Sequence, residues 1–127
     1  MDILNNDQLI SIFQIVIGLS VIRVWTINFN RPSSWRGGSA LNMREEFEAY
    51  GLPSWMMYLV GTLKVVFSIG LLVGLWVPEI VKFSASGIAI LMFFAILMHL
   101  KIKDPIIKSI PSVTFMILSL LIVILES

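Results

Sequence analysis

Four long apolar stretches, separated by polar segments, dominate the hydrophobic pattern of this 127-residue chain. Each stretch holds about 20 residues, which is the length that an α-helix rising ~1.5 Å per residue needs to cross the hydrocarbon core of a bilayer. The pattern therefore predicts four membrane-spanning helices, at residues 8–29, 54–77, 80–100 and 106–125. Because the spans are close together in a short chain, we expect one all-α domain over residues 1–127, an integral membrane four-helix bundle.

The connection between the first two spans carries the pattern of a short amphipathic helix. Asn42 followed by Glu45 resembles a capping box, in which two side chains bond the backbone N–H groups at the start of a helix. Three apolar residues then recur at helical spacing, namely Met43, Phe47 and Tyr50. Gly51 is a helix stop. We expect a helix over residues 43–50 that lies at the membrane surface or over the mouth of the bundle.

The last span contains a proline that affects where its helix begins. A helix starting only at Pro111 would reach ~22 Å by Leu125, which is too short for a ~30 Å hydrocarbon core. We therefore start the helix at Ile106 and expect a bend at Pro111. Asp104 and Pro105 are predicted to be the N-cap and the first helical residue.

The composition agrees with a membrane protein, since 57% of the residues are hydrophobic and 13% are charged. The net charge of +1 offers no basic surface for nucleic acid. There is no cysteine and one histidine, so we expect no disulfide, no thiol redox chemistry and no metal site. The acidic start MDILNND predicts no cleavable signal peptide.

Lys64 interrupts the second span and is the main candidate for function. It lies nine residues after Trp55, roughly 13 Å along the helix and near the middle of the bilayer. A lysine there costs about 2.5–3.5 kcal/mol on insertion scales, so it is expected to face the bundle interior. It shares a helical face with Gly61 and Ser68. The candidate ligand-binding residues of a cytoplasm-facing cavity are Lys64, Arg23, His99, Gln14 and Ser68.

Alternatives to a binding role stay open for these residues. Arg23 can instead snorkel to the membrane interface, and His99 can bond a loop carbonyl. The partner of Lys64 can be Gln14, Ser68, a backbone carbonyl, water, a bound anion or a glutamate of the amphipathic helix, namely Glu45, Glu46 or Glu48. A separate set of small residues is predicted to serve helix packing: Gly61, Gly70, Gly74, Ala85 and Ala89.

Basic residues are distributed unevenly between the two ends of the predicted bundle. Six lie in the connections that follow the first and third spans, and one, Lys82, lies at the opposite end. The positive-inside rule therefore places these two connections in the cytoplasm and both termini on the non-cytoplasmic side. The six residues are Arg31, Arg36, Arg44, Lys101, Lys103 and Lys108.

Residues 47–125 resemble the DoxX-like family of small four-span membrane proteins. The resemblance lies in FEAYGLPSWMMYLVGTLKVVFSIGLLVGL, in GIAILMFFAILMHLKIKDP and in the proline near the start of the last span. The charged residue that the family has in its second span matches Lys64, and the family's histidine matches His99. The resemblance implies a four-helix bundle in the bacterial inner membrane. It implies no single activity, since relatives include a thiosulfate–quinone oxidoreductase subunit, members of redox-stress complexes and a receptor-assembly chaperone.

Three functions fit the sequence. We expect a small non-catalytic membrane subunit or assembly factor that packs against a partner membrane protein, or against copies of itself, through its glycine and alanine faces. The alternative is a protein that binds a quinone, a lipid or an anion in a polar cavity around Lys64. A transporter is the third. No nucleophile accompanies Lys64 and His99, so an enzyme is not expected, and no cofactor is expected unless a quinone or lipid serves as one.

Overall fold

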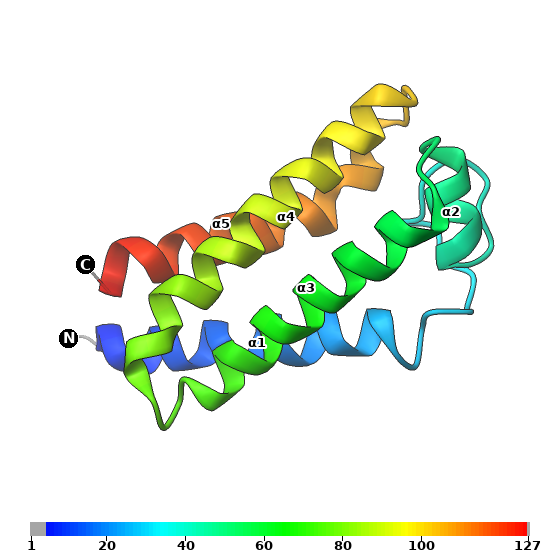
Figure 1. Cartoon of the computed structure of the whole chain (residues 1–127). Coiled ribbons are helices and arrows are strands. Elements are labelled where there is room, and N and C mark those ends of the chain that lie inside the picture. The colour runs from blue at the N-terminus through cyan, green and yellow to red at the C-terminus, as the bar shows by residue number, and fades with distance from the viewer. Residues whose placement is uncertain (1–4, 127) are drawn as a thin grey trace.

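The computed structural model describes residues 5–126, and within that range every regular element is helical. Four helical segments are long and apolar enough to cross a membrane, which confirms the predicted four-helix membrane bundle. They correspond to α1, α3, α4 and α5, while the short helix α2 lies in the first connection (Figure 1). The bounds are α1 Asn6–Trp25, α2 Met43–Ala49, α3 Ser54–Val73, α4 Val81–Lys101 and α5 Ile110–Glu126.

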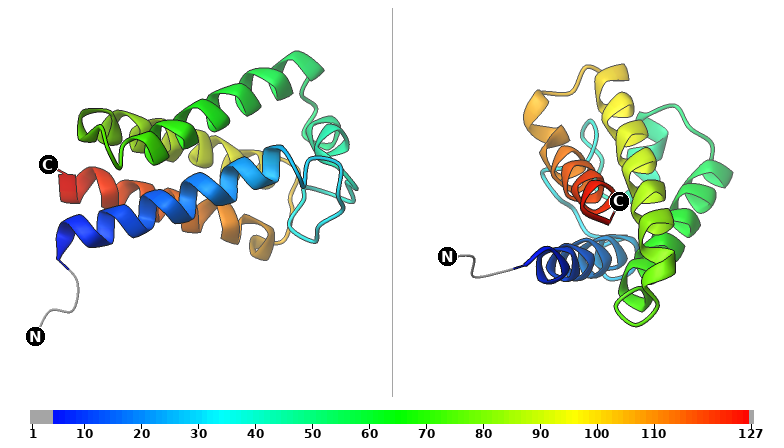
Figure 2. Two further views of the ribbon diagram at one scale, coloured as in Figure 1. Left: turned by 90° about the horizontal axis from the view of Figure 1, so that it is seen from below. Right: turned by 90° about the vertical axis from the view of Figure 1, so that its left-hand side faces the viewer.

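The four long helices form a ring in which α1 packs on α3, α3 on α4, α4 on α5, and α5 on α1. Figure 2 shows this ring from one end. The first turn of α1, the α3–α4 turn and the last turn of α5 lie at one end of the bundle, and α2 lies at the other (Figure 1). The two ends of the described chain are therefore on the same side, as an even number of spans requires.

Two helices end sooner than their apolar runs predict. α1 ends at Trp25 and not at Phe29, because the amides of Thr26 and Asn28 both turn back to the Arg23 carbonyl at 3.4 and 2.9 Å. α3 ends at Val73, after which Gly74 begins a turn and Pro78–Ile80 forms a single 3₁₀ turn before α4. Apolar content continues through both turns, so hydrophobicity alone does not mark these helix ends.

The last span begins at Ile106 as predicted, but its first turn differs from the expectation. Residues Ile106–Ser109 form a 3₁₀ turn, and the α-helix begins at Ile110, so the change in geometry precedes Pro111. Pro105 is the N-cap of the 3₁₀ turn and is not its first helical residue. The prediction that Asp104 caps this span is wrong, because its carboxylate bonds elsewhere, as described below.

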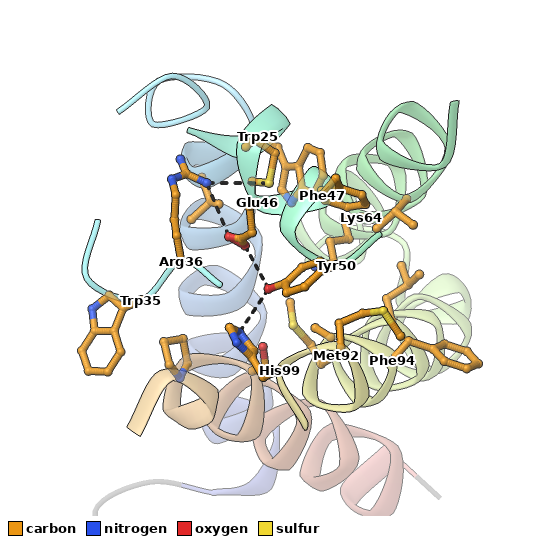
Figure 3. Close-up of a pocket in the computed structure, with 18 of the residues that line it drawn as sticks. Trp25, Trp35, Arg36, Glu46, Phe47, Tyr50, Lys64, Met92, Phe94 and His99 are labelled. Atoms are coloured by element: carbon orange, nitrogen blue, oxygen red, sulfur yellow. Dashed lines mark hydrogen bonds and ion pairs between the residues drawn. The ribbon is translucent and has the colours of Figure 1, made fainter. Parts of the chain in front are cut away.

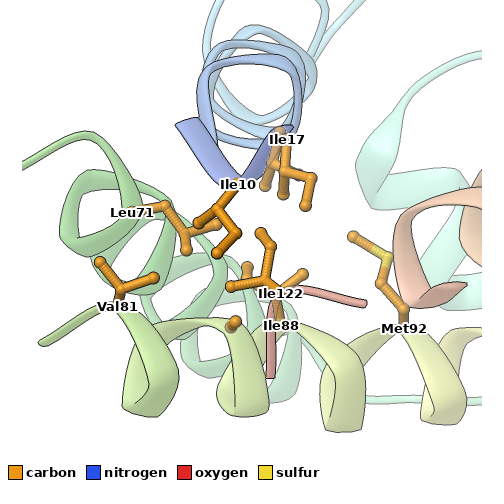
Figure 4. Close-up of a cluster of buried hydrophobic side chains, with 9 residues drawn as sticks. Ile10, Ile17, Leu71, Val81, Ile88, Met92 and Ile122 are labelled. Carbon is orange, nitrogen blue, oxygen red and sulfur yellow. The ribbon is translucent and has the colours of Figure 1, made fainter. Parts of the chain in front are cut away.

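A cluster of branched side chains fills the centre of the bundle (Figure 4). Every long helix contributes, for example Ile17 from α1, Leu71 from α3, Ile88 from α4 and Ile122 from α5, each with no exposed surface. Membrane helices gain little from burying apolar groups that lipid would also surround, so close packing has to hold them together.

The small residues predicted to serve helix packing do so within this chain. A Cβ added at Gly61 would lie 2.5 Å from the Trp25 ring of α1, and one at Gly74 would lie 2.5 Å from Val81 of α4. At Gly70 an added Cβ would meet the Ser84 hydroxyl. Ala85 and Ala89 are buried as well. These contacts join the bundle's own helices, and packing of the same faces against a partner protein stays a prediction.

Candidate functional site

Helix α2 covers one end of the bundle, and its sequence explains its position. Asn42 caps the helix by accepting a 2.8 Å hydrogen bond from the Glu45 amide, and the Glu45 carboxylate in turn accepts one from the Leu41 amide at 3.2 Å. The chain leaves the helix through Gly51, whose φ of +77° favours glycine. The predicted apolar face is confirmed, since all three of its residues are buried: Met43, Phe47 and Tyr50.

A cavity of about 420 Å³ lies between α2 and the long helices (Figure 3). Residues from α1, α2, α3, α4 and α5 line it. Its walls are largely apolar. They include Trp25 of α1, Phe47 of α2, Val60 of α3, and Met92 and Phe94 of α4. The lining also includes a smaller group of polar and charged residues: Asn28, Ser33, Arg36, Glu46, Tyr50, Lys64, His99, Lys108 and Ser112.

Lys64 faces this cavity, which is the inward orientation that the sequence predicts. Its ammonium nitrogen lies 5.6 Å from the centre of the Trp25 ring, at the distance of a cation–π interaction. Within residues 5–126 no hydrogen-bond acceptor reaches this nitrogen. Of the three glutamates considered from the sequence, Glu46 lines the same cavity.

Two of the predicted binding residues lie deeper in the bundle and do not line the cavity. Gln14 donates a 2.7 Å hydrogen bond from its amide nitrogen to the Leu71 carbonyl, which lies in the last turn of α3, where helical carbonyls lack intrahelical partners. Ser68 is fully buried, and its hydroxyl has no hydrogen-bond partner among the described residues. Neither side chain is the partner of Lys64.

Arg23 also lies outside the cavity. Its side chain is exposed in the last turn of α1. This is the position that an arginine needs in order to extend to the membrane interface. Of the five candidate residues, the cavity brings together Lys64 and His99 alone.

His99 belongs to a chain of polar side chains and does not bond a loop carbonyl through its ring. Its Nδ1 lies 2.8 Å from the Asp104 carboxylate, and its Nε2 lies 3.4 Å from the Tyr50 hydroxyl. The Tyr50 hydroxyl is also 3.3 Å from Glu46, which pairs with Arg36 at 3.7 Å. Figure 3 shows the part of this chain from Arg36 to His99. Helix α2 is thereby joined to the end of α4.

The Tyr50 hydroxyl links the two halves of this chain. It donates to Glu46 at 3.3 Å, and its oxygen lies 3.4 Å from His99 Nε2, where the donor depends on which ring nitrogen carries a proton.

Burial raises the pKa of the Tyr50 hydroxyl well above its ordinary value of 10, and the neighbouring charges of Glu46 and Asp104 raise it further. Arg36 acts in the opposite direction, with a smaller effect. The hydroxyl consequently stays protonated and remains a hydrogen-bond donor over the physiological pH range. The sequence analysis assigned Tyr50 to the apolar face of the short helix because of its spacing. It gave no role to the tyrosine hydroxyl, which was the available sign of a polar contact.

The comparison with protein families bears on this arrangement. The model of the DoxX-like family matches residues 34–122, a range that begins in the loop before α2 and ends in α5. The chain belongs to the DoxX-like family. The match includes most of the cavity-lining residues of this DoxX-like chain, among them Lys64 and His99. No curated protein and no solved structure matches the chain.

Proposed function

We propose that this DoxX-like protein binds an apolar membrane molecule with a polar end group, such as a quinone or a lipid, in the cavity beneath α2. One observation carries the proposal: apolar walls enclose the Lys64 ammonium, which has no hydrogen-bond partner in the described chain. A volume of about 420 Å³ falls within the range of ~300–1,000 Å³ typical of small-molecule sites. Small-molecule sites are usually lined by apolar side chains with a minority of polar groups, as this cavity is.

The arrangement of α3 and α4 supports entry from the bilayer. The two helices diverge toward the end of the bundle that α2 covers (Figure 1). Residues of both helices line the cavity there, including Val60 on α3 and Phe94 on α4. Phe94 is half exposed, so it belongs at once to the cavity and to the lipid-facing surface. We propose the bacterial cytoplasmic membrane as the location, with α2 on the cytoplasmic side.

Filling the cavity tests this function. Ala95 is a partly buried lining residue of α4, and an Ala95→Phe side chain would occupy the space that the ligand needs. We expect the purified variant to lose the quinone or lipid that co-purifies with the wild-type protein, measured by mass spectrometry of organic extracts. Leu97→Phe is the control, because Leu97 is exposed on the same helix and does not line the cavity. Equal ligand content in the Ala95→Phe and wild-type proteins would refute the proposal.

A further inference from the structure

We infer that the polar end group of the ligand is a carboxylate, so that the cavity receives a long-chain carboxylic acid with its head at Lys64. The inference rests on the proposed binding function and identifies the chemical class of the ligand. In this arrangement the apolar chain lies along the walls formed by Val60, Leu91 and Phe94. Four observations support it, concerning Lys64, the other lining cations, the balance of charge and the number of free donors.

Lys64 has hydrogen-bonding capacity that the described chain does not use. An ammonium group carries three N–H donors. Trp25 faces it with a ring, which attracts the charge but accepts no full-strength hydrogen bond. Gln14 and Ser68, which the sequence analysis named as candidate partners of Lys64, do not reach its ammonium group. A ligand oxygen in the cavity would supply the missing acceptor.

The other two cations of the lining already donate to backbone carbonyls. Arg36 donates from Nε to the Arg31 carbonyl at 3.0 Å and from Nη2 to the Asn28 carbonyl at 2.6 Å. Lys108 donates to the Arg36 carbonyl at 2.8 Å and to the Gly38 carbonyl. Both side chains hold the loop before α2 in place. Lys64 is therefore the lining cation that is available to a ligand.

Charge in the lining is not balanced by the protein. Three lining residues are cationic, Arg36, Lys64 and Lys108, whereas Glu46 is the lining carboxylate. Glu46 already pairs with Arg36 at 3.7 Å. A neutral carbonyl would accept a hydrogen bond from Lys64 but would leave its charge without a close counter-ion. A carboxylate supplies both the acceptor and the counter-ion.

The number of free donors favours a carboxylate over a phosphate. Phosphate groups present three acceptor oxygens and are usually bound by several donors, often by arginine in bidentate geometry. Here the guanidinium of Arg36 is engaged by carbonyls and by Glu46, and Lys108 already donates to two carbonyls, so Lys64 is the described lining cation whose donors are all unused. One ammonium matches one carboxylate.

The test compares ligands that differ only in their head group. Equilibrium binding of radiolabelled hexadecanoic acid, hexadecanol and hexadecyl phosphate is measured on the detergent-solubilised full chain at pH 8. We expect the acid to bind the wild-type protein ~10-fold more tightly than the alcohol, because the carboxylate adds an ion pair with Lys64 to the hydrogen bond that either head group can accept. Lys64→Met should lower the affinity for the acid to that for the alcohol. Lys82→Met is the control, because Lys82 is exposed at the other end of the bundle, and it should change neither.

Three outcomes would overturn the inference, and they separate it from the proposed function. Equal binding of acid and alcohol by the wild-type protein, with both lost in Ala95→Phe, would show a lipophilic site without carboxylate recognition. Tighter binding of hexadecyl phosphate than of the acid would assign the site to phosphate. Absence of binding by any of the three compounds would overturn the inference, whereas the ligand content of Ala95→Phe decides the proposed function separately. The comparison on the wild-type protein needs no variant, so it stands even if Lys64→Met fails to fold.

Discussion

The hydrogen bonds that Asp104 and Tyr50 make depend on which residues the fold places next to them. Asp104 precedes a proline and has the sequence context of a helix cap, yet its carboxylate accepts from the Gly38 amide at 3.1 Å and holds the His99 ring at 2.8 Å. Tyr50 has the spacing of an apolar-face residue, yet its hydroxyl joins Glu46 to His99. Buried polar groups require partners, so these contacts stabilise α2 on the bundle as well as shape the cavity.

The protonation of Tyr50 predicts a loss of stability in alkali. Its pKa is higher in the folded protein than in the unfolded chain, so the folded state retains a proton that the unfolded state releases above pH ~10. The stabilisation is complete below the unfolded pKa and is lost as the pH rises beyond it. We expect the melting temperature of the wild-type protein to fall between pH 9 and pH 11, and Tyr50→Phe to weaken this dependence.

The measurement is thermal unfolding in detergent across that pH range. Tyr58→Phe provides the control, since Tyr58 is exposed and bonds Arg44 away from the cavity. That variant should show the same alkaline loss as the wild-type protein. If Tyr50→Phe also loses stability to the full extent, the alkaline transition belongs to other groups and not to Tyr50.

At the scale of elements, α2 is fixed to the bundle by apolar and polar contacts together. Phe47 meets the Trp25 ring with centroids 5.9 Å apart, and Met57 of α3 completes this small core. From α4, Lys101 donates to the Tyr50 carbonyl at 2.8 Å. Trp25 in turn packs on Gly61 and lies under the Lys64 ammonium. The position of α2 and the environment of Lys64 therefore depend on the same tryptophan.

Gly61→Ala tests this dependence, because helix propensity and packing predict opposite changes in the free energy of unfolding. Helix propensity alone predicts that alanine stabilises a helix interior by roughly 1 kcal/mol relative to glycine. Here the added Cβ would come within 2.5 Å of the Trp25 ring, so we expect a net destabilisation of about 1–3 kcal/mol. Chemical unfolding in mixed micelles measures it. Thr62→Ala, at an exposed neighbouring position, should change stability little. A stabilised Gly61→Ala protein would contradict the close α1–α3 contact.

At the scale of the whole molecule, charge is polarised along the bundle axis. The six basic residues of the two cytoplasmically assigned connections lie at the end that carries α2, and Lys82 lies at the opposite end. The fold thus places the cavity at the basic end. From the positive-inside rule we predict that this end is cytoplasmic and that both termini lie on the other side.

Site-directed labelling tests this orientation, and the absence of native cysteine makes it direct. Ser34 is exposed at the α2 end, and Lys82 is exposed at the other end. In spheroplasts, we expect a membrane-impermeant maleimide to label Lys82→Cys and to label Ser34→Cys only after permeabilisation. The reverse pattern would invert the topology and place the cavity on the outer side.

The four spans, the short helix between the first two and the inward orientation of Lys64 could all be predicted from the amino-acid sequence. These features depend on local physics: the length of an apolar run, the capping of α2 by Asn42, and the free-energy cost of a lysine in lipid. The helix ends at Trp25 and Val73 were not predictable in this way, because apolar residues continue through the turns that follow.

The cavity and its polar chain could not be predicted from the sequence, because they depend on how the helices pack. Tyr50, His99 and Asp104 come together because α2 folds back over the end of α4, and the contact between Tyr50 and His99 joins residues 49 positions apart. Gln14 and Ser68 have the polarity of binding residues, but the ring order of the helices places one against the Leu71 carbonyl and leaves the other buried away from the cavity. Periodicity tells which residues share a helical face, whereas the packing of helices decides what that face meets.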